Sequence, residues 1–413
     1  MLAVVLLFTS LSLAFALGIM APLFEEVRAV NAMVPSDGGY FAAEAGVEDA
    51  VYRIKRGMTI GTSESVDING ATAVVAIETS GGNTTITADG TSRVYTRTVE
   101  TTLETGSGAS FFYGIQTDLG LNVNNNAAIH GNVYSNGLVH AQNNAYIYGD
   151  VVAAGPDGFF TGNATGTVYA HTIQNATIGK DAYYQVKTSS TVLGTSYPGS
   201  PDQPIIALPD LSETINGWEA DALAGGAISS CSGGTYTVSG NVMLGPVKIN
   251  CNLSVSNGKT VTLLGHVWVS GNITLNNNVT MRIDPSLGSA SVAVIADNPQ
   301  NRLTSSAINI QNNVVLEGTG VSPSTIVMVS RNEGGEDWTA VNYNNNGGDN
   351  EVVFYAPGAV TNFNNNASIS AVTAFFANIN NNTEVIYKSG LANLLFTGGP
   401  SGGYELESWK EVE

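Results

Sequence analysis

The pattern of apolar and polar positions divides the chain into three parts with different periodicities. The first part begins with residues 1–24, which are predominantly apolar and carry no charge before Glu25. At about 1.5 Å per residue, a helix of this length is as long as the hydrocarbon core of a bilayer is thick. The pattern therefore predicts a hydrophobic N-terminal helix that is long enough to cross a membrane.

A second helical segment follows in the same part of the chain. In residues 40–56, apolar residues recur at helical spacing, and Asp49 and Arg53 lie four residues apart, as a surface ion pair does. The sequence VPSDGG between the two segments predicts a break or a loop. Gly18 and Pro22 predict a kink near the proline, because proline removes a backbone donor and clashes with the preceding turn.

The second part, residues 58–110, changes from helical spacing to alternation. The runs ATAVVAIET, NTTITADG and SRVYTRTVETTLE are joined by short segments rich in glycine, asparagine and aspartate. Alternation of this kind is typical of strands with one buried face, and the short connections are typical of hairpin turns. We expect a small antiparallel sheet here.

The third part repeats itself. Within residues 111–190, NNNAAIHGNVYSNG is followed by QNNAYIYGDVVAAG, with a period of about 18 residues. Such a period suits one coil of a parallel β-helix, which is stable only when stacked on neighbouring coils. Asn125 and Asn126 align with Asn143 and Asn144. We predict that they form positive-φ turns and that their amides bond along the stack.

Related asparagine runs continue in residues 226–413, among them LNNNVTMRI, IQNNVVLEG and FNNNASISAVTAFF. These runs predict a second β-helix block. The expected fold class is therefore mainly β: a long N-terminal α-helix, a small antiparallel sheet and a parallel β-helix, or solenoid. A β-sandwich with asparagine-rich hairpins is the alternative, and the parallel self-match argues against it.

Residues 191–225 interrupt the repeats. They contain several prolines and then a helix-like segment over residues 211–224, for which Ser212 is a candidate cap. We interpret this segment as an excursion that either crosses the solenoid or covers one end of it, where polar capping is required.

Residues 1–57 resemble a mature type IV pilin, with an apolar stretch, Pro22, charged residues and then a second amphipathic stretch. The sequence YFAAEAGVEDAVYRIKRG is similar to a segment of PilX-like pilus proteins. The resemblance implies that Met1 is the processed first residue and that the helix packs with copies of itself in a filament. Most pilins carry a glutamate at position 5 of the mature chain, whereas this chain has Val5.

Composition and charge narrow the range of partners. Charged residues make up 12% of the chain, and the formal net charge is −19. This balance argues against nucleic acid, which requires clustered lysine and arginine. Cys231 and Cys251 predict one disulfide in an oxidising compartment, and two buried free thiols are the alternative.

The search for chemistry gives few candidates. No phosphate-binding, dinucleotide or zinc fingerprint is present, and isolated acidic residues do not repeat at coil spacing. We therefore predict neither an enzyme nor a cofactor. Glu336, Asp337, Asp349 and Glu351 lie in two acidic loops and are weak calcium candidates, because calcium prefers carboxylate oxygens.

Glycosylation sequons are about as frequent as composition predicts by chance. The candidate asparagines are Asn83, Asn163, Asn175, Asn252, Asn272, Asn278, Asn366 and Asn381.

Taken together, these features predict a structural subunit of an extracellular type IV pilus-like filament. It would begin as a membrane-inserted precursor, and its partners would be other copies, the pilus assembly machinery and other pilins. Two alternatives stay open: a minor pilin or tip adhesin that binds a surface or a glycan, and a membrane-anchored polysaccharide-active enzyme.

Overall fold

The computed structural model divides the chain into two compact units. We call residues 1–106 with 404–413 the helix–sheet unit, and residues 107–403 the parallel-strand unit. The structure describes residues 2–55, 60–80, 83–105, 113–344, 346, 351–388, 391, 395–396 and 404–412. In the first thirty residues it describes the helical backbone from Leu2, and the side chains only of Thr9, Phe15, Met20, Glu26 and Val27.

The helix–sheet unit begins with one uninterrupted helix, α1 (Leu2–Lys55). The predicted break at VPSDGG is wrong, because α1 runs straight through it. The reason lies in packing: a Cβ on Gly39 would come within 2.8 Å of the Gly90 carbonyl oxygen, and one on Gly90 within 2.0 Å of the Gly39 oxygen. These glycines let helix and sheet approach closely, and that contact overrides the weak helix propensity. The predicted ion pair forms, with Arg53 2.9 Å from Asp49.

Five antiparallel strands complete this unit, in the order β1-β2-β3-β4-β37. They are β1 (Ser63–Ile68), β2 (Ala71–Ser80), β3 (Asn83–Ser92), β4 (Tyr95–Thr105) and β37 (Tyr404–Val412). The last strand returns from the far end of the chain and pairs with β4, with Trp409 opposite Thr101. The second repeat block therefore does not extend to residue 413 as predicted. The parallel-strand unit is instead an insertion between two neighbouring strands of the small sheet.

The core of the helix–sheet unit lies between the C-terminal part of α1 and one face of the sheet. Ala43, Val47 and Ala50 of α1 are buried against sheet residues that include Val75 and Leu103. Buried residues recur every three or four positions along α1 and at every second position along the strands, as expected for a helix and a sheet that each bury one face.

The parallel-strand unit contains two blocks of strands. The first comprises β5 (Ile115–Val123), β6 (Ala128–His130), β7 (Val133–Ser135), β8 (Leu138–Ala141), β9 (Tyr146–Tyr148), β10 (Val151–Ala153), β11 (Phe159–Ala164), β12 (Val168–Ala170), β13 (Thr172–Ile178), β14 (Ala182–Tyr184), β15 (Val186–Thr188), β16 (Thr191–Val192) and β17 (Ser196–Pro198). The second comprises β18 (Ala227–Ile228), β19 (Thr235–Val238), β20 (Val242–Leu244), β21 (Val247–Ile249), β22 (Asn252–Val255), β23 (Thr260–Leu263), β24 (Val267–Val269), β25 (Ile273–Leu275), β26 (Thr280–Ile283), the 3-10 helix η1 (Pro285–Leu287), β27 (Ala290–Ala296), β28 (Ile308–Ile310), β29 (Val315–Glu317), β30 (Ile326–Ser330), β31 (Gly335–Asn344), β32 (Val352–Asn364), β33 (Ser368–Ile369), β34 (Ala371–Ile379), β35 (Glu384–Ile386) and β36 (Leu395–Phe396).

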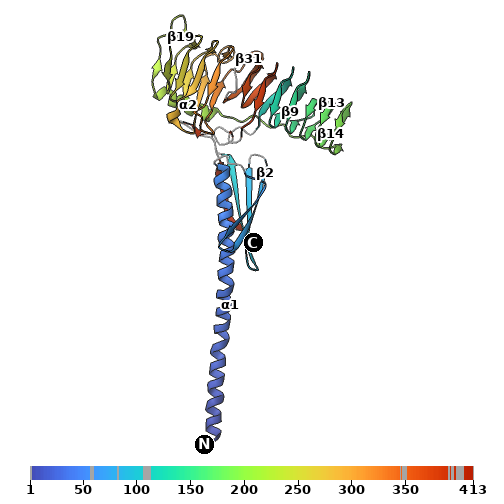
Figure 1. Cartoon of the computed structure of the whole chain (residues 1–413), viewed down its shortest axis with the longest axis vertical. Coiled ribbons are helices and arrows are strands. Elements are labelled where there is room, and N and C mark those ends of the chain that lie inside the picture. The colour runs from blue at the N-terminus through green and yellow to red at the C-terminus, as the bar shows by residue number, and fades with distance from the viewer. Residues whose placement is uncertain are drawn as a thin grey trace. The chain divides into compact units, whose positions relative to one another are not determined.

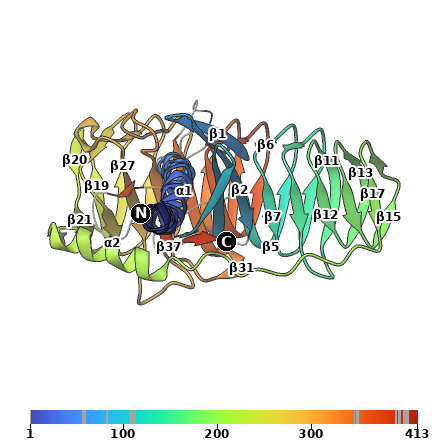
Figure 2. The ribbon, with the colours of Figure 1, turned by 90° about the horizontal axis from the view of Figure 1, so that it is seen from below.

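Strands of this unit pair in parallel with strands of the next segment of the same block, for example β7 with β10 and β10 with β12. The expectation of a mainly β chain with parallel sheets is thus confirmed. The two blocks join in an order that the sequence did not indicate: β34, near the end of the second block, pairs in parallel with β5, which begins the first. The stack therefore runs from β18 to β34 and continues from β5 to β17 (Figure 2).

The interruption between the blocks follows from this order. The chain leaves the stack after β17 and must reach β18 at the opposite end. Residues 199–211, which we call the connecting segment, contact Tyr134 through the Pro204 carbonyl and Tyr355 through the Pro209 carbonyl. Then α2 (Ser212–Ala224) follows and leads to β18 (Figure 2). The segment thus runs along the stack, and Ser212 makes no side-chain cap, because the N-cap position is Leu211.

Candidate functional site

The first candidate for function is the part of α1 that the sheet does not cover. Among the described side chains of α1, the first buried one is that of Pro35. Before it, Phe15 is 68% exposed and Met33 is 64% exposed. Figure 1 shows the helix continuing well beyond the strands of its own unit toward the N-terminus. In the described part of the chain, no helix is both long enough and apolar enough to cross a bilayer.

The predicted polymerisation residues lie in this helix. Val5, Gly18 and Pro22 all have helical backbone. The side chains of Val5 and Pro22 lie outside what the structure describes, as does the whole of Met1. The kink near Pro22 stays a prediction.

The second candidate is an outward-facing row of side chains that runs the length of the stack. Its members occupy the same register position on successive strands, and most are apolar or aromatic. In stack order they are Ala227, Lys248, Trp268, Ile295, Val329, Tyr355, Thr373, Gln116, Tyr134, Val152, Tyr169, Tyr183 and Tyr197. We call this set the outward row.

The segment between the blocks covers part of the outward row. Ile215 and Trp218 of α2 are buried in a cluster with Ile295 and Val329, which lie outside the main core of the stack. The connecting segment covers Tyr134 further along, where the Tyr134 hydroxyl donates to the Pro204 carbonyl. An apolar row on an exposed sheet face needs such a cover, because water contact with contiguous apolar surface is unfavourable.

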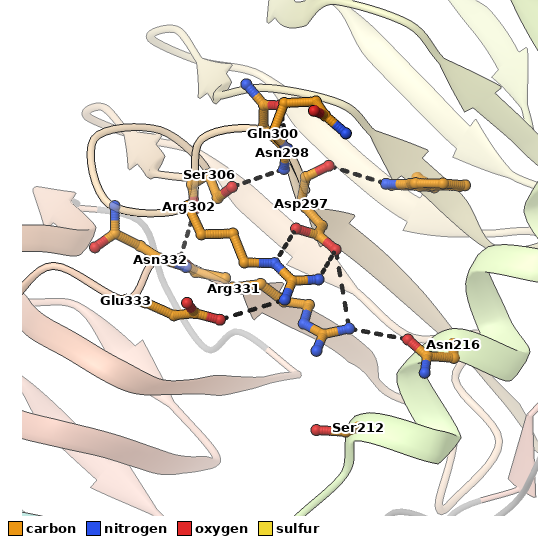
Figure 3. A network of polar contacts seen from close by, with 12 residues as sticks. Ser212, Asn216, Asp297, Asn298, Gln300, Arg302, Ser306, Arg331, Asn332 and Glu333 are labelled. Carbon is orange, nitrogen blue, oxygen red and sulfur yellow. Dashed lines mark hydrogen bonds and ion pairs between the residues drawn. The ribbon is translucent and has the colours of Figure 1, made fainter.

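A network of polar contacts fixes α2 in place (Figure 3). Asp297 is fully buried and receives two hydrogen bonds from Arg302, at 2.8 and 2.7 Å. Arg331 lies 3.9 Å from the same carboxylate and donates to Asn216 of α2 at 3.0 Å. The bidentate geometry is the strong form of an arginine–carboxylate pair, and it satisfies a charge that burial would otherwise penalise.

Glu219 adds a second buried carboxyl to this network. The residue is 8% exposed, and its Oε1 has no hydrogen-bond partner among the described residues. Burial, followed by the charge of Asp297, raises the pKa of Glu219 to about 8, against the opposing effect of Arg331 and Arg302. At neutral pH this carboxyl is therefore mostly protonated and donates a hydrogen bond to Asp297. The pair positions α2 on the stack.

The end of the outward row beyond the cover carries stacked tyrosines. The rings of Tyr169 and Tyr183 lie 4.6 Å apart, and those of Tyr183 and Tyr197 lie 4.5 Å apart, with interplanar angles of 10° and 9°. A similar stack joins His130 and Tyr148 on another face, at 4.6 Å. Because these rings stack on one another along the strand-to-strand direction, they present edges rather than faces to solvent.

Asparagine side chains form ladders across the turns of the stack. The predicted turn residues Asn125, Asn126, Asn143 and Asn144 all have positive φ, between 53° and 62°. Asn143 donates to Asn125, and Asn125 donates to Asn381 of the other block, at 3.2 and 3.0 Å. The ladder therefore crosses the junction between the two blocks. Each amide is both donor and acceptor, which suits an unbroken row.

The predicted disulfide forms between Cys231, which follows β18, and Cys251, which follows β21. The four calcium candidates lie in different environments. Glu336 and Asp337 lie exposed in β31, Glu351 accepts from Lys388 at 3.0 Å, and Asp349 lies outside the described residues. No three acidic, histidine or cysteine side chains come together as a metal site in the described part of the chain.

The sequon asparagines fall in several environments. Asn366 and Asn381 use their amide nitrogens in the ladders, as donors to Asn346 and Asn365. Asn252 and Asn272 accept backbone N–H groups through their side-chain oxygens. The remainder lie in strands or turns: Asn163 and Asn175 in β11 and β13, Asn278 in a positive-φ turn, and Asn83 in β3 with its side chain outside the described set.

Sequence reasoning missed the polar network and the outward row. Asp297, Arg302 and Arg331 are separated from α2 by more than seventy residues, so no local spacing connects them. The signal that was available is the alternation itself, because Trp268, Ile295 and Tyr355 are apolar at outward positions where a solvated face would be polar.

Comparisons with known proteins give matches only among solved structures. No family model matches the chain. No curated protein matches it either. Among solved structures, the chain is similar to the competence-associated pilin ComZ from Thermus thermophilus, with 12% sequence identity over 92% of this chain and 97% of that one. The TM-score is 0.40, which is too low for the likeness to carry an argument.

Proposed function

We propose that the protein is a subunit of a type IV pilus-like filament at the cell surface, and that α1 is its polymerisation element. Before assembly, the apolar part of α1 would lie in the membrane. In the filament it would pack against α1 of other copies, with the pilus assembly machinery and other pilins as further partners. The parallel-strand unit would be a parallel β-helix carried by this subunit, and its role would be structural rather than catalytic.

One observation carries the proposal: the sheet covers only the C-terminal part of a helix of 54 residues. The described side chains before Pro35 include exposed Phe15, Met20, Val27 and Met33. Burying one such side chain against a neighbouring helix contributes about 2 kcal/mol. A helix of this kind gains most of its stability from partners outside its own unit.

The test places a charge on the uncovered part of α1. Phe15→Asp should abolish or strongly reduce the filaments that can be sheared from cells, while the amount of protein in the membrane fraction persists. Val94→Asp is the matched control, because Val94 is an exposed apolar residue in the hairpin turn between β3 and β4. Filaments as abundant in Phe15→Asp as in the control would contradict the proposal.

A second candidate function, that of a minor pilin or tip adhesin, is supported by the exposed aromatic stacks. Tyr146 and Tyr148 are both exposed, and Tyr197 is exposed at one end of the outward row. Immunogold labelling with an antibody to the parallel-strand unit separates the two candidates. Label along the whole filament supports the main subunit, and label confined to the tips supports the adhesin.

A further inference from the structure

The two ends of the strand stack have open edges. At one end, β17 pairs only with β14 among the described strands, and β15 and β16 pair only with β13. At the other end, β18 and β19 pair only with β21 and β22. Unpaired strand edges are templates for association, and natural proteins protect them. The side chains at the two ends therefore indicate how each edge is protected.

One inward-facing row of core side chains can be followed through the whole stack. It starts at Tyr236 in β19, continues with Leu253 and Ile273, and reaches Phe160 and Ile173 before its last strand. The position that follows Ile173 in register is Lys187 of β15. All interior members of this row are apolar except Thr361 in β32, and the row ends in a positive charge.

The side chain of Lys187 lies across the end of the core. Its Nζ donates to Ser196 Oγ at 3.3 Å and lies 5.4 Å from the centre of the Tyr184 ring. Ser196 itself follows Ala182, the last apolar member of a second core row. Lysine and serine therefore form a polar bridge across two inward positions of this end, whereas a third, Val192 of β16, is apolar.

The opposite end is apolar. Its inward positions are Ile228, Tyr236 and Val242, which are half-buried and pack against the main core. Because the blocks share one strand direction, the β15–β17 end of one copy matches the β18–β20 end of a second copy in strand polarity. In a continuous stack of two copies, Lys187 of one copy and Tyr236 of the next would occupy successive positions of the same inward-facing row. Burying the ammonium there, without a carboxylate, would be strongly unfavourable.

We propose that Lys187 is a blocking residue that prevents the strand stack of one copy from adding to that of a second copy. The partner that this end excludes is the β18–β20 end of the same protein. Such contacts would be heterologous and would generate open chains rather than closed assemblies. This inference goes beyond the proposed function, since it concerns a second way in which copies could join and does not require α1.

The test removes the charge and keeps the length of the side chain. Lys187→Met in the full chain, held in detergent micelles, should associate with rising concentration, so that the weight-average mass in sedimentation velocity at least doubles relative to wild type. Lys187→Leu is the second variant, in case the first does not keep the native circular dichroism spectrum. Lys187→Arg should behave as wild type, because it retains the charge.

Two controls locate the association. Lys180→Met removes the same charge from an exposed turn in the neighbouring coil and should leave the mass unchanged. Adding Tyr236→Lys to Lys187→Met should reverse the association, because it places a charge on the opposite end. The proposal fails if natively folded Lys187→Met and Lys187→Leu both keep the wild-type mass, or if Tyr236→Lys does not reverse their association.

Discussion

Glu219 allows a quantitative prediction, because burial holds its carboxyl protonated in the folded state. Its pKa is raised from 4.5 to about 8, by burial first and by Asp297 second. A folded-state pKa above the unfolded value means that the folded state binds the proton more tightly. The stability contributed by the protonated group is therefore complete below pH 4.5 and is lost as the pH rises toward 8. Glu219→Gln replaces the protonated carboxyl with a neutral amide that can still donate to Asp297.

The magnitude follows from the interval between the two pKa values. At about 1.4 kcal/mol per pH unit, the range from 4.5 to 7 corresponds to about 3 kcal/mol. Glu219→Gln should thus stabilise the docking of α2 by up to about 3 kcal/mol at pH 7, and by almost nothing at pH 4.5. Because α2 and the part of the outward row that it covers form one local cluster, the effect should appear as reduced local opening of α2.

Amide hydrogen exchange of the full chain, read by mass spectrometry on peptides from residues 212–224, measures this opening. In the wild type, the opening free energy of α2 should fall between pH 5 and 8 after correction for the intrinsic exchange rate. In Glu219→Gln it should be nearly independent of pH. Glu213→Gln, the same change at an exposed position of α2, should keep the wild-type slope. Equal slopes in wild type and Glu219→Gln would refute the reasoning.

Two further predictions concern the fold. Gly90→Ala should destabilise the helix–sheet unit by about 3 kcal/mol, because its Cβ would lie 2.0 Å from the Gly39 oxygen of α1; thermal unfolding of the variant beside Gly240→Ala, where a Cβ has open space, checks this, and equal melting temperatures would contradict it. Asn125→Ala should cost about 2 kcal/mol, because it loses both the ladder bond and a residue that tolerates positive φ, whereas Asn125→Gly should cost only about 1 kcal/mol. Denaturant titration followed by tyrosine fluorescence would compare the two variants, and the reverse ranking would contradict the argument from positive φ.

The periodicity of the sequence was sufficient for the elements but not for their order. Alternation and the 18-residue repeat lead directly to the antiparallel hairpins and to parallel pairing of successive segments, because both depend on residues close in sequence. The pairing of β34 with β5 and the return of β37 to β4 depend on contacts across most of the chain. No local pattern carries that information.

The candidate site divides in the same way. The turn conformation of Asn125 and its neighbours was predictable, because asparagine tolerates positive φ on its own account. The helical state of the VPSDGG segment was not, because the close contact of Gly39 with Gly90 joins residues far apart in the sequence. Glu219 was also missed, since an acidic residue in an amphipathic helix normally faces water, and only the fold places it beside Asp297.

The junction between β34 and β5 has a consequence for synthesis. During translation the first block emerges long before its neighbour, since Asn122 and its ladder partner Asn378 are 256 residues apart in the chain. Until residues 371–379 leave the ribosome, β5 presents an unsatisfied backbone edge. The nascent chain must therefore keep this edge from pairing with other chains, and completion of the stack waits for a segment that is made long after the first block.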